Sequence, residues 1–125
     1  MPSHRAQRVA EMIHRELAQR LRTEVKDPEL TPISITRVEV SGDLSRAMVY
    51  WLPLGGGTPA PSLVDAVGRA ARTLRGRIGR ALRLRHAPEL RCEVDQQHDA
   101  AVDVLMTLRK LEQERVARGK EDVET

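Results

Sequence analysis

The 125-residue sequence has no phenylalanine, and its only large aromatic residues are the neighbours Tyr50 and Trp51. A hydrophobic core must therefore be built from leucine, isoleucine, valine, alanine and methionine. Successive strand residues face opposite sides, so we expect one of the two aromatics in the core and the other at the surface or an edge. Proteins that read single strands commonly stack bases on aromatic rings, and this sequence offers little for that mode of recognition.

Residues that carry chemistry are also few. The single cysteine, Cys92, excludes an internal disulfide, and the apolar/polar alternation around it predicts a buried strand position and a structural thiol. The histidines at positions 4, 14, 86 and 98 are scattered and lack the spacing of a metal site. No nucleophile elbow, Walker loop or zinc signature is present. We therefore expect no enzyme, no cofactor, no metal and no small-molecule substrate.

Long apolar runs are missing too. No stretch approaches the ~18 uninterrupted apolar residues of a membrane span, and the N-terminus lacks the apolar run of a secretory signal, so we expect a cytoplasmic protein without a membrane partner. The formal net charge of +3 is unevenly spread: residues 1–95 carry 16 Lys+Arg against 11 Asp+Glu, and residues 96–125 carry 5 against 7. The basic part favours a polyanionic partner.

The N-terminal pattern is that of an amphipathic helix. Apolar residues recur at every fourth position from Val9 to Val25, which predicts a helix over residues 3–25. Asp27-Pro28 ends it, because the residue before a proline avoids helical geometry.

A hairpin is predicted next. The run 33–40 is rich in β-branched residues, but its alternation slips between Ile35 and Val38, so we expect a β-bulge near Thr36-Arg37. A turn at 41–43 leads to a second strand over 47–52. The glycines and prolines of 53–61 predict a flexible linker, since the Gly-Lys-Ser/Thr of a phosphate loop is absent.

Ser62 and Asp65 resemble a capping box that opens a second helical region. One side of it is apolar, and Arg69, Arg72, Arg80 and Arg83 fall on the opposite face. Its three glycines, Gly68, Gly76 and Gly79, each cost about 1 kcal/mol relative to alanine, so we expect a break or kink and not one continuous helix.

A third strand is predicted over 90–94, followed by a weak helix over 100–111 and a charged end at 115–125. The order predicts an α+β domain at residues 1–95, with a three-stranded sheet covered by helices on one face. Residues 96–125 form a C-terminal tail. With no apolar stripe left for an interface, we expect a monomer.

The arginines between Ala66 and Pro88 are the most informative feature. Seven of them occur there without one acidic residue. A solvated helical face usually mixes charges of both signs, whereas arginines that neutralise phosphates explain charges of one sign. We therefore predict an RNA-binding surface made of Arg69, Arg72, Arg75, Arg80, Arg83 and Arg85, with Arg77 further round the helix.

Several runs resemble ribosome-binding factor A, a bacterial small-subunit assembly factor, over roughly residues 5–95. They are Arg8-Val-Ala10, Val25-Lys-Asp-Pro28, Ile35-Thr-Arg-Val-Glu-Val-Ser41, Asp43-Leu-Ser45, Ala47 with Val49-Tyr50, and Leu82-Arg-Leu-Arg85 leading to Pro88-Glu-Leu90. The resemblance implies a type II KH-like fold: helix, two strands, helix-kink-helix, strand. It also implies a protein without catalytic activity that binds the small (30S) subunit through 16S ribosomal RNA and supports late maturation, rRNA processing and cold adaptation.

The same resemblance places the family's interhelical kink at Ala70-Ala71-Arg72, with arginine where the family has glycine. Gly76-Arg-Ile-Gly79 imitates the Gly-x-x-Gly loop of KH domains but lies six residues later, so we interpret it as helix.

Two other functions stay open. One is a generic KH module for any single-stranded nucleic acid. The other is a protein-interaction module, in which the first helix or the tail docks a partner through Val102, Leu105 and Leu108.

Overall fold

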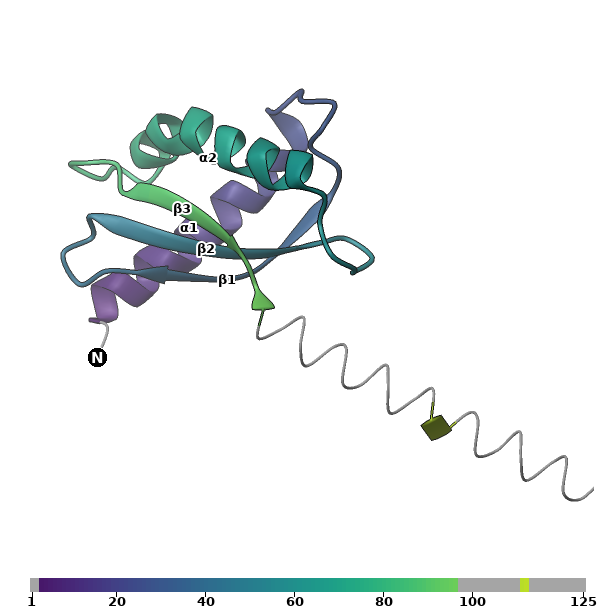
Figure 1. Ribbon diagram of the computed structural model, residues 1–125. Helices are drawn as coiled ribbons and strands as arrows, with labels where there is room; N and C mark the ends of the chain where they lie inside the picture. The colour runs from purple at the N-terminus through teal and green to yellow at the C-terminus, as the bar shows by residue number, and fades with distance from the viewer. Residues whose placement is uncertain (1–2, 97–110, 113–125) are drawn as a thin grey trace, which may run out of the picture. The chain divides into compact units, whose positions relative to one another are not determined.

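The computed structural model describes residues 3–96 and 111–112. Its elements follow the order α1 (His4–Thr23), β1 (Ile33–Val40), β2 (Arg46–Pro53), α2 (Pro61–Ala81) and β3 (Glu89–Val94) (Figure 1). All five belong to one compact unit, Met1–Asp95. The weak helix expected over 100–111 lies outside the described residues except for Leu111, and the charged end lies outside them altogether.

The first helix begins at His4, directly after its N-cap residue. Ser3 is the N-cap, and its hydroxyl oxygen accepts a hydrogen bond from the Ala6 N–H at 3.1 Å, which satisfies one of the free donors of the first turn. The helix ends at Thr23, two residues before the predicted end. Its apolar stripe is buried at Ala6, Val9, Ala10, Ile13 and Leu17, as the periodicity predicted.

The sheet has the order β1-β2-β3. β1 and β2 are antiparallel, and their register shifts between Ile35 and Arg37, which confirms the bulge. β3 is parallel to β2, with Ala47 opposite Leu90. A parallel pair needs a crossover connection, and α2 supplies it.

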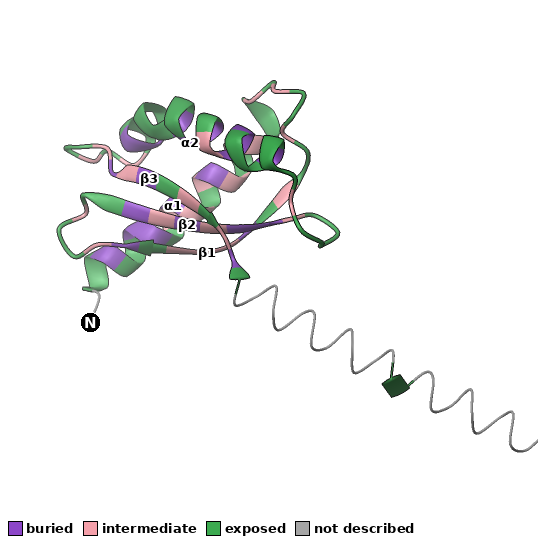
Figure 2. Ribbon diagram, in the orientation of Figure 1, coloured by how far each residue is buried: buried purple, intermediate pink, exposed green. Residues whose placement is uncertain are grey.

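Both helices pack on one face of this sheet, as expected. The main core joins α1, α2 and the inward residues of all three strands (Figure 2). Trp51 is 1% exposed and packs with Leu63 and Val67 in a second cluster. Tyr50, on the opposite face, is half-buried. The expected division of the two aromatics is therefore confirmed.

The prediction of an interhelical kink at Ala70-Ala71-Arg72 is wrong, because α2 is helical without interruption from Pro61 to Ala81. Eight residues of α2 are buried, and each large apolar side chain among them contributes about 1.5–3 kcal/mol on burial. This gain exceeds the cost of about 1 kcal/mol for each of the three glycines. Burial against the sheet thus overrides local propensity.

The prediction of a capping box at Ser62 is also wrong. Ala60 is the N-cap, with no side-chain hydrogen bond, and Pro61 opens the helix. Proline fits this position because its missing N–H would have no partner inside the helix. Within the described residues, no helix has the length and apolar character needed to span a membrane.

Candidate nucleic-acid interface

The arginines of the basic segment all reach solvent, but they do not all lie on a helix. Five of them project from α2, at positions 69, 72, 75, 77 and 80. The helix ends at Ala81, so Arg83 and Arg85 belong to the loop that connects α2 to β3. Our prediction that Arg83 shares a helical face with the others is therefore wrong, although its side chain is exposed in the loop that directly follows the helix.

Two arginines are neutralised by carboxylates from elsewhere in the chain. Arg69 pairs with Asp27 at 3.0 Å and with Glu29 at 3.1 Å, and hydrogen bonding to both carboxylates raises the pKa of its guanidinium. Arg77 pairs with Glu24 at 3.1 Å. The premise that no carboxylate compensates this segment therefore fails for Arg69 and Arg77, since the acids lie at the end of α1 and in the loop after it.

Arg75 has a structural contact of its own. Its Nε and one terminal nitrogen donate to the carbonyl oxygen of Ala87, at 3.3 and 3.0 Å. This bidentate contact ties the loop before β3 to the helix. Arg75 is still exposed, so part of its charge faces solvent.

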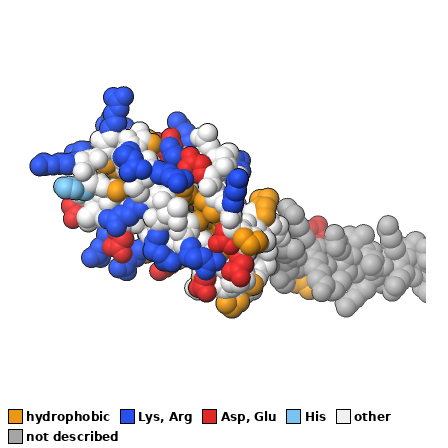
Figure 3. Space-filling view, turned by 90° about the horizontal axis from the view of Figure 1, so that it is seen from above, with side chains coloured by type: hydrophobic (Ala, Val, Ile, Leu, Met, Phe, Trp, Pro, Cys, Tyr) orange, Lys and Arg blue, Asp and Glu red, His pale blue; other side chains and the backbone are white. Residues whose placement is uncertain are grey.

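Four arginines of the basic segment form neither an ion pair nor a side-chain hydrogen bond within the part of the chain that the structure describes. We call them the four-arginine surface: Arg72, Arg80, Arg83 and Arg85. Figure 3, which looks onto the side of α2, shows Lys and Arg side chains predominating on the left, where α2 ends and the loop follows. A basic residue near a helix C-terminus is favourable in itself, which accounts for Arg80 but not for the rest.

The loop that carries Arg83 and Arg85 closes α2 as a Schellman motif. The Leu84 N–H donates to the Gly79 carbonyl at 3.0 Å, and the Arg83 N–H donates to the Arg80 carbonyl at 3.1 Å. Arg83 occupies the left-handed position, with φ of 55°. Glycine is the usual residue there, so an exposed arginine is held in a conformation that costs energy.

Close packing fixes this loop on the helix. A Cβ at Gly79 would lie 2.7 Å from the Cβ of Ala87, which real structures do not tolerate. Gly79 is therefore required by the approach of the loop, and the Gly76-Arg-Ile-Gly79 run is helix, as expected. Together with the Arg75 contact, this packing holds Arg83 and Arg85 beside the end of α2.

A hollow of about 470 Å³ lies between α2 and the edge strand β3. Arg72 and Arg75 line it from the helix, and Arg91 lines it from the strand. Glu89 and Glu93 line it too, and Glu89 pairs with Arg91 at 3.1 Å. Sequence reasoning left out Arg91, although the alternation of β3 already placed its side chain outward.

Cys92 lies at this hollow without being reactive. Burial raises the pKa of its thiol to about 11, and the nearby positive charge of Arg72 only partly opposes the shift. The thiol is therefore neutral at physiological pH, consistent with a structural role.

No aromatic ring lies at the hollow. Tyr50, on the sheet face opposite the helices, has the Arg37 guanidinium 3.8 Å above its ring centre, and Trp51 is in the core. The arrangement therefore suits phosphate contacts through guanidinium groups better than base stacking on aromatic rings.

This element order, with β3 parallel to β2 and both helices on one face, is that of a KH-like α+β domain. The sequence matches the family model of ribosome-binding factor A over residues 5–108. The chain therefore belongs to the ribosome-binding factor A family, and the resemblance read from the sequence is confirmed.

Individual members of this family are similar to the chain in sequence and in structure. Ribosome-binding factor A of Desulfitobacterium hafniense is 40% identical over 91% of each chain. The crystal structure of ribosome-binding factor A from Thermus thermophilus matches with a TM-score of 0.60 and 25% identity, over 71% of this chain and 94% of that one. A Thermus thermophilus model fitted into the cryo-EM map of a complex with 30S matches with a TM-score of 0.55 and 26% identity, over 67% and 88%.

Proposed function

We propose that this protein is a non-catalytic assembly factor that binds the small ribosomal subunit through 16S ribosomal RNA. It acts in the cytoplasm during late maturation and rRNA processing, including growth in the cold. Residues 1–95 are the RNA-binding domain, residues 96–125 are a C-terminal tail, and the protein acts as a monomer.

The observation that carries this proposal is the four-arginine surface at the outer side and end of α2. Each phosphate that an arginine neutralises releases condensed counterions, so exposed arginines without an acidic partner bind RNA most effectively. The related Thermus thermophilus protein has been fitted into a map of a 30S complex, which supports the small subunit as the source of that RNA.

The contacts of the six arginines predicted to bind RNA support a ranking among them. Arg72, Arg80, Arg83 and Arg85 are available without breaking an ion pair or a hydrogen bond of the side chain. Arg69 must leave Asp27 and Glu29, and Arg75 is held by the Ala87 carbonyl. Arg69 and Arg75 therefore contribute less to RNA affinity than the other four.

Co-sedimentation of the purified protein with immature small subunits, mature small subunits, large subunits and unstructured RNA tests this function. We expect selective, salt-sensitive binding to small subunits. Equal binding to every RNA would instead make the protein a generic KH module. An absence of binding to any of them would redirect the search to protein partners.

A charge-matched pair of variants tests the surface. The triple variant Arg72→Glu, Arg80→Glu, Arg83→Glu should abolish binding and keep the fold, because all three side chains are exposed. The control triple variant Arg5→Glu, Arg8→Glu, Arg15→Glu changes the net charge equally through exposed residues of α1. Equal losses in both triples would mean that net charge, and not this surface, determines affinity.

A further inference from the structure

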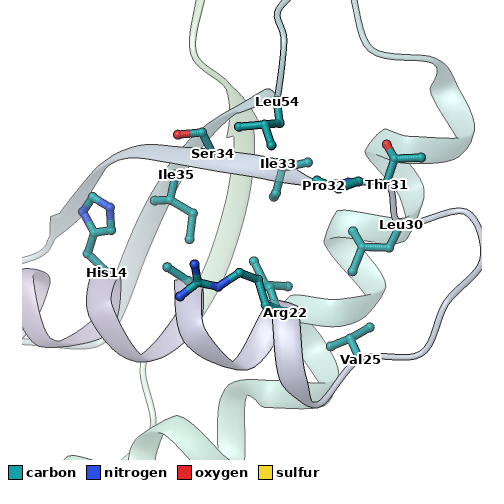
Figure 4. A pocket seen from close by; sticks show the side chains of 12 residues that line it. His14, Arg22, Val25, Leu30, Thr31, Pro32, Ile33, Ser34, Ile35 and Leu54 are labelled. Carbon is teal, nitrogen blue, oxygen red and sulfur yellow. The ribbon is translucent and has the colours of Figure 1, made fainter.

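The two edges of the sheet differ in chemistry. The β3 edge faces the hollow lined by arginines and glutamates. The β1 edge faces a groove of about 570 Å³ between β1, the segment before it and the C-terminal half of α1 (Figure 4). Of the described residues that line this groove, His14 and Arg22 alone are ionisable, and most of the others are apolar.

We propose that this groove binds an extended, acidic and apolar segment of a partner protein, which adds a strand to the open edge of β1. This interaction is independent of the RNA contact proposed for α2. It uses the opposite edge of the sheet and none of the arginines of the four-arginine surface.

The main chain of β1 offers the required hydrogen bonds. The Leu54 N–H donates to the Pro32 carbonyl at 3.0 Å, and Ser34 stands opposite Leu52. Since the main-chain groups of successive strand residues point to opposite edges, those of Ile33 and Ile35 point away from β2. An incoming strand can pair with them, as in strand addition generally.

The groove is apolar and incompletely covered. Leu21, Val25, Leu30 and Ile33 line it as half-buried side chains, and Leu54 at its rim is 69% exposed. Burial of such side chains by a partner is favourable by the same apolar transfer that drives folding. Alternate side chains of an added strand point into such a groove.

Charge selects the partner's composition. Arg22 is exposed and forms no ion pair among the described residues, and the groove lining contains no acidic side chain. An acidic residue in the incoming segment would pair with Arg22, whereas a phosphate backbone gains nothing from the apolar floor. The groove therefore fits a peptide and not a nucleic acid.

The bulge sets the length of the segment. Regular pairing of β1 is interrupted between Ile35 and Arg37, so the open edge is regular only over the stretch that leads up to Ile35. A partner segment pairs with a few residues and stops at the bulge.

The test is a titration of the ¹⁵N-labelled full-length protein with a short capped peptide that alternates valine and glutamate. We expect the amide signals of Ile33 and Ile35 to shift and their exchange with solvent to slow. Two matched peptides are controls: one with N-methylated main-chain nitrogens on its pairing side, and one with lysine in place of glutamate. Both should bind at least about tenfold more weakly.

Surface variants locate the site. Leu54→Asp and Arg22→Glu should each weaken binding by about tenfold or more without unfolding the protein, since both residues are exposed. Val64→Asp is the matched control, because Val64 is 41% exposed on α2 and does not line the groove. The arginine triple variant of α2 should bind the peptide normally.

Three outcomes would overturn the proposal. The first is an absence of shifts at millimolar peptide. The second is equal binding of the N-methylated or lysine peptide. The third is a peptide-free dimer in sedimentation equilibrium that Leu54→Asp dissociates, because a second copy of this chain would then occupy the edge.

Discussion

Replacement of Arg83 by glycine should stabilise the fold while weakening RNA binding. Arg83 has φ of 55° at the left-handed position of the Schellman motif that ends α2. For a residue with a Cβ, left-handed helical geometry costs roughly 1–2 kcal/mol. Glycine removes this cost but loses about 0.4–1 kcal/mol because its unfolded chain is more flexible. The net gain in the free energy of unfolding should be about 0.5–1 kcal/mol.

The assay is urea unfolding followed by circular dichroism, with Arg83→Ala as the matched control. Both variants lose the guanidinium, so their difference isolates the backbone effect of the Cβ. We expect Arg83→Gly to be more stable than Arg83→Ala by about 1 kcal/mol. Both variants should lose RNA affinity to a similar extent, because affinity depends on the missing charge.

Equal stability of the glycine and alanine variants would refute the reasoning, because the left-handed backbone would then cost no more than the roughly 0.4–1 kcal/mol that glycine loses through its more flexible unfolded chain. If Arg83→Gly kept full RNA affinity, Arg83 would be excluded from the proposed surface. The two readouts therefore test the loop geometry and the binding role separately.

Other perturbations test neighbouring parts of the structure. Gly79→Ala should destabilise the protein by about 1–3 kcal/mol, because the added Cβ would lie 2.7 Å from that of Ala87. Gly76→Ala should stabilise the protein by about 0.5–1 kcal/mol, because the added Cβ meets only the Arg80 guanidinium, at 3.4 Å. Urea unfolding measures both changes, and a change of the same sign in the two variants would contradict this reasoning. The thiol of Cys92 should resist iodoacetamide at pH 8 in the folded protein and react once it unfolds. Because the pKa of the thiol is raised from 9.0 to about 11, its contribution to stability is present below pH 9 and is lost as the pH rises toward 11. Rapid labelling of Cys92 in the native protein would show that the thiol is not buried as described. The triple alanine variant of Arg72, Arg80 and Arg83 should make the negative slope of log RNA-binding constant against log salt concentration shallower by roughly 2 to 3. An unchanged slope in filter binding would place the phosphate contacts elsewhere.

The local features of the fold were predictable from the sequence because they depend on neighbouring residues. The apolar period of four defined α1, and the slipped alternation after Ile35 defined the bulge. The pair Tyr50 and Trp51 had to divide between two faces, because consecutive strand residues always do.

The errors in α2 have one physical origin. The low helix propensity of glycine argued for a kink, and the Ser62 pattern argued for a different start. Both are local signals. The helix instead gains most of its stability from side chains buried against the sheet, which no local signal measures. Gly79 is present because Ala87 approaches it in space.

The sequence by itself determined the order of the elements, the inward and outward faces of each, and a basic segment of seven arginines. Only the tertiary structure decided which of those charges are neutralised, because Asp27 and Glu24 lie 42 and 53 residues from the arginines that they meet. It also decided that, among the described residues, β1 and β3 are the edge strands of the sheet, one beside a mostly apolar groove and one beside a charged hollow. Ion pairs and sheet edges depend on contacts between distant segments, and a local pattern cannot encode them.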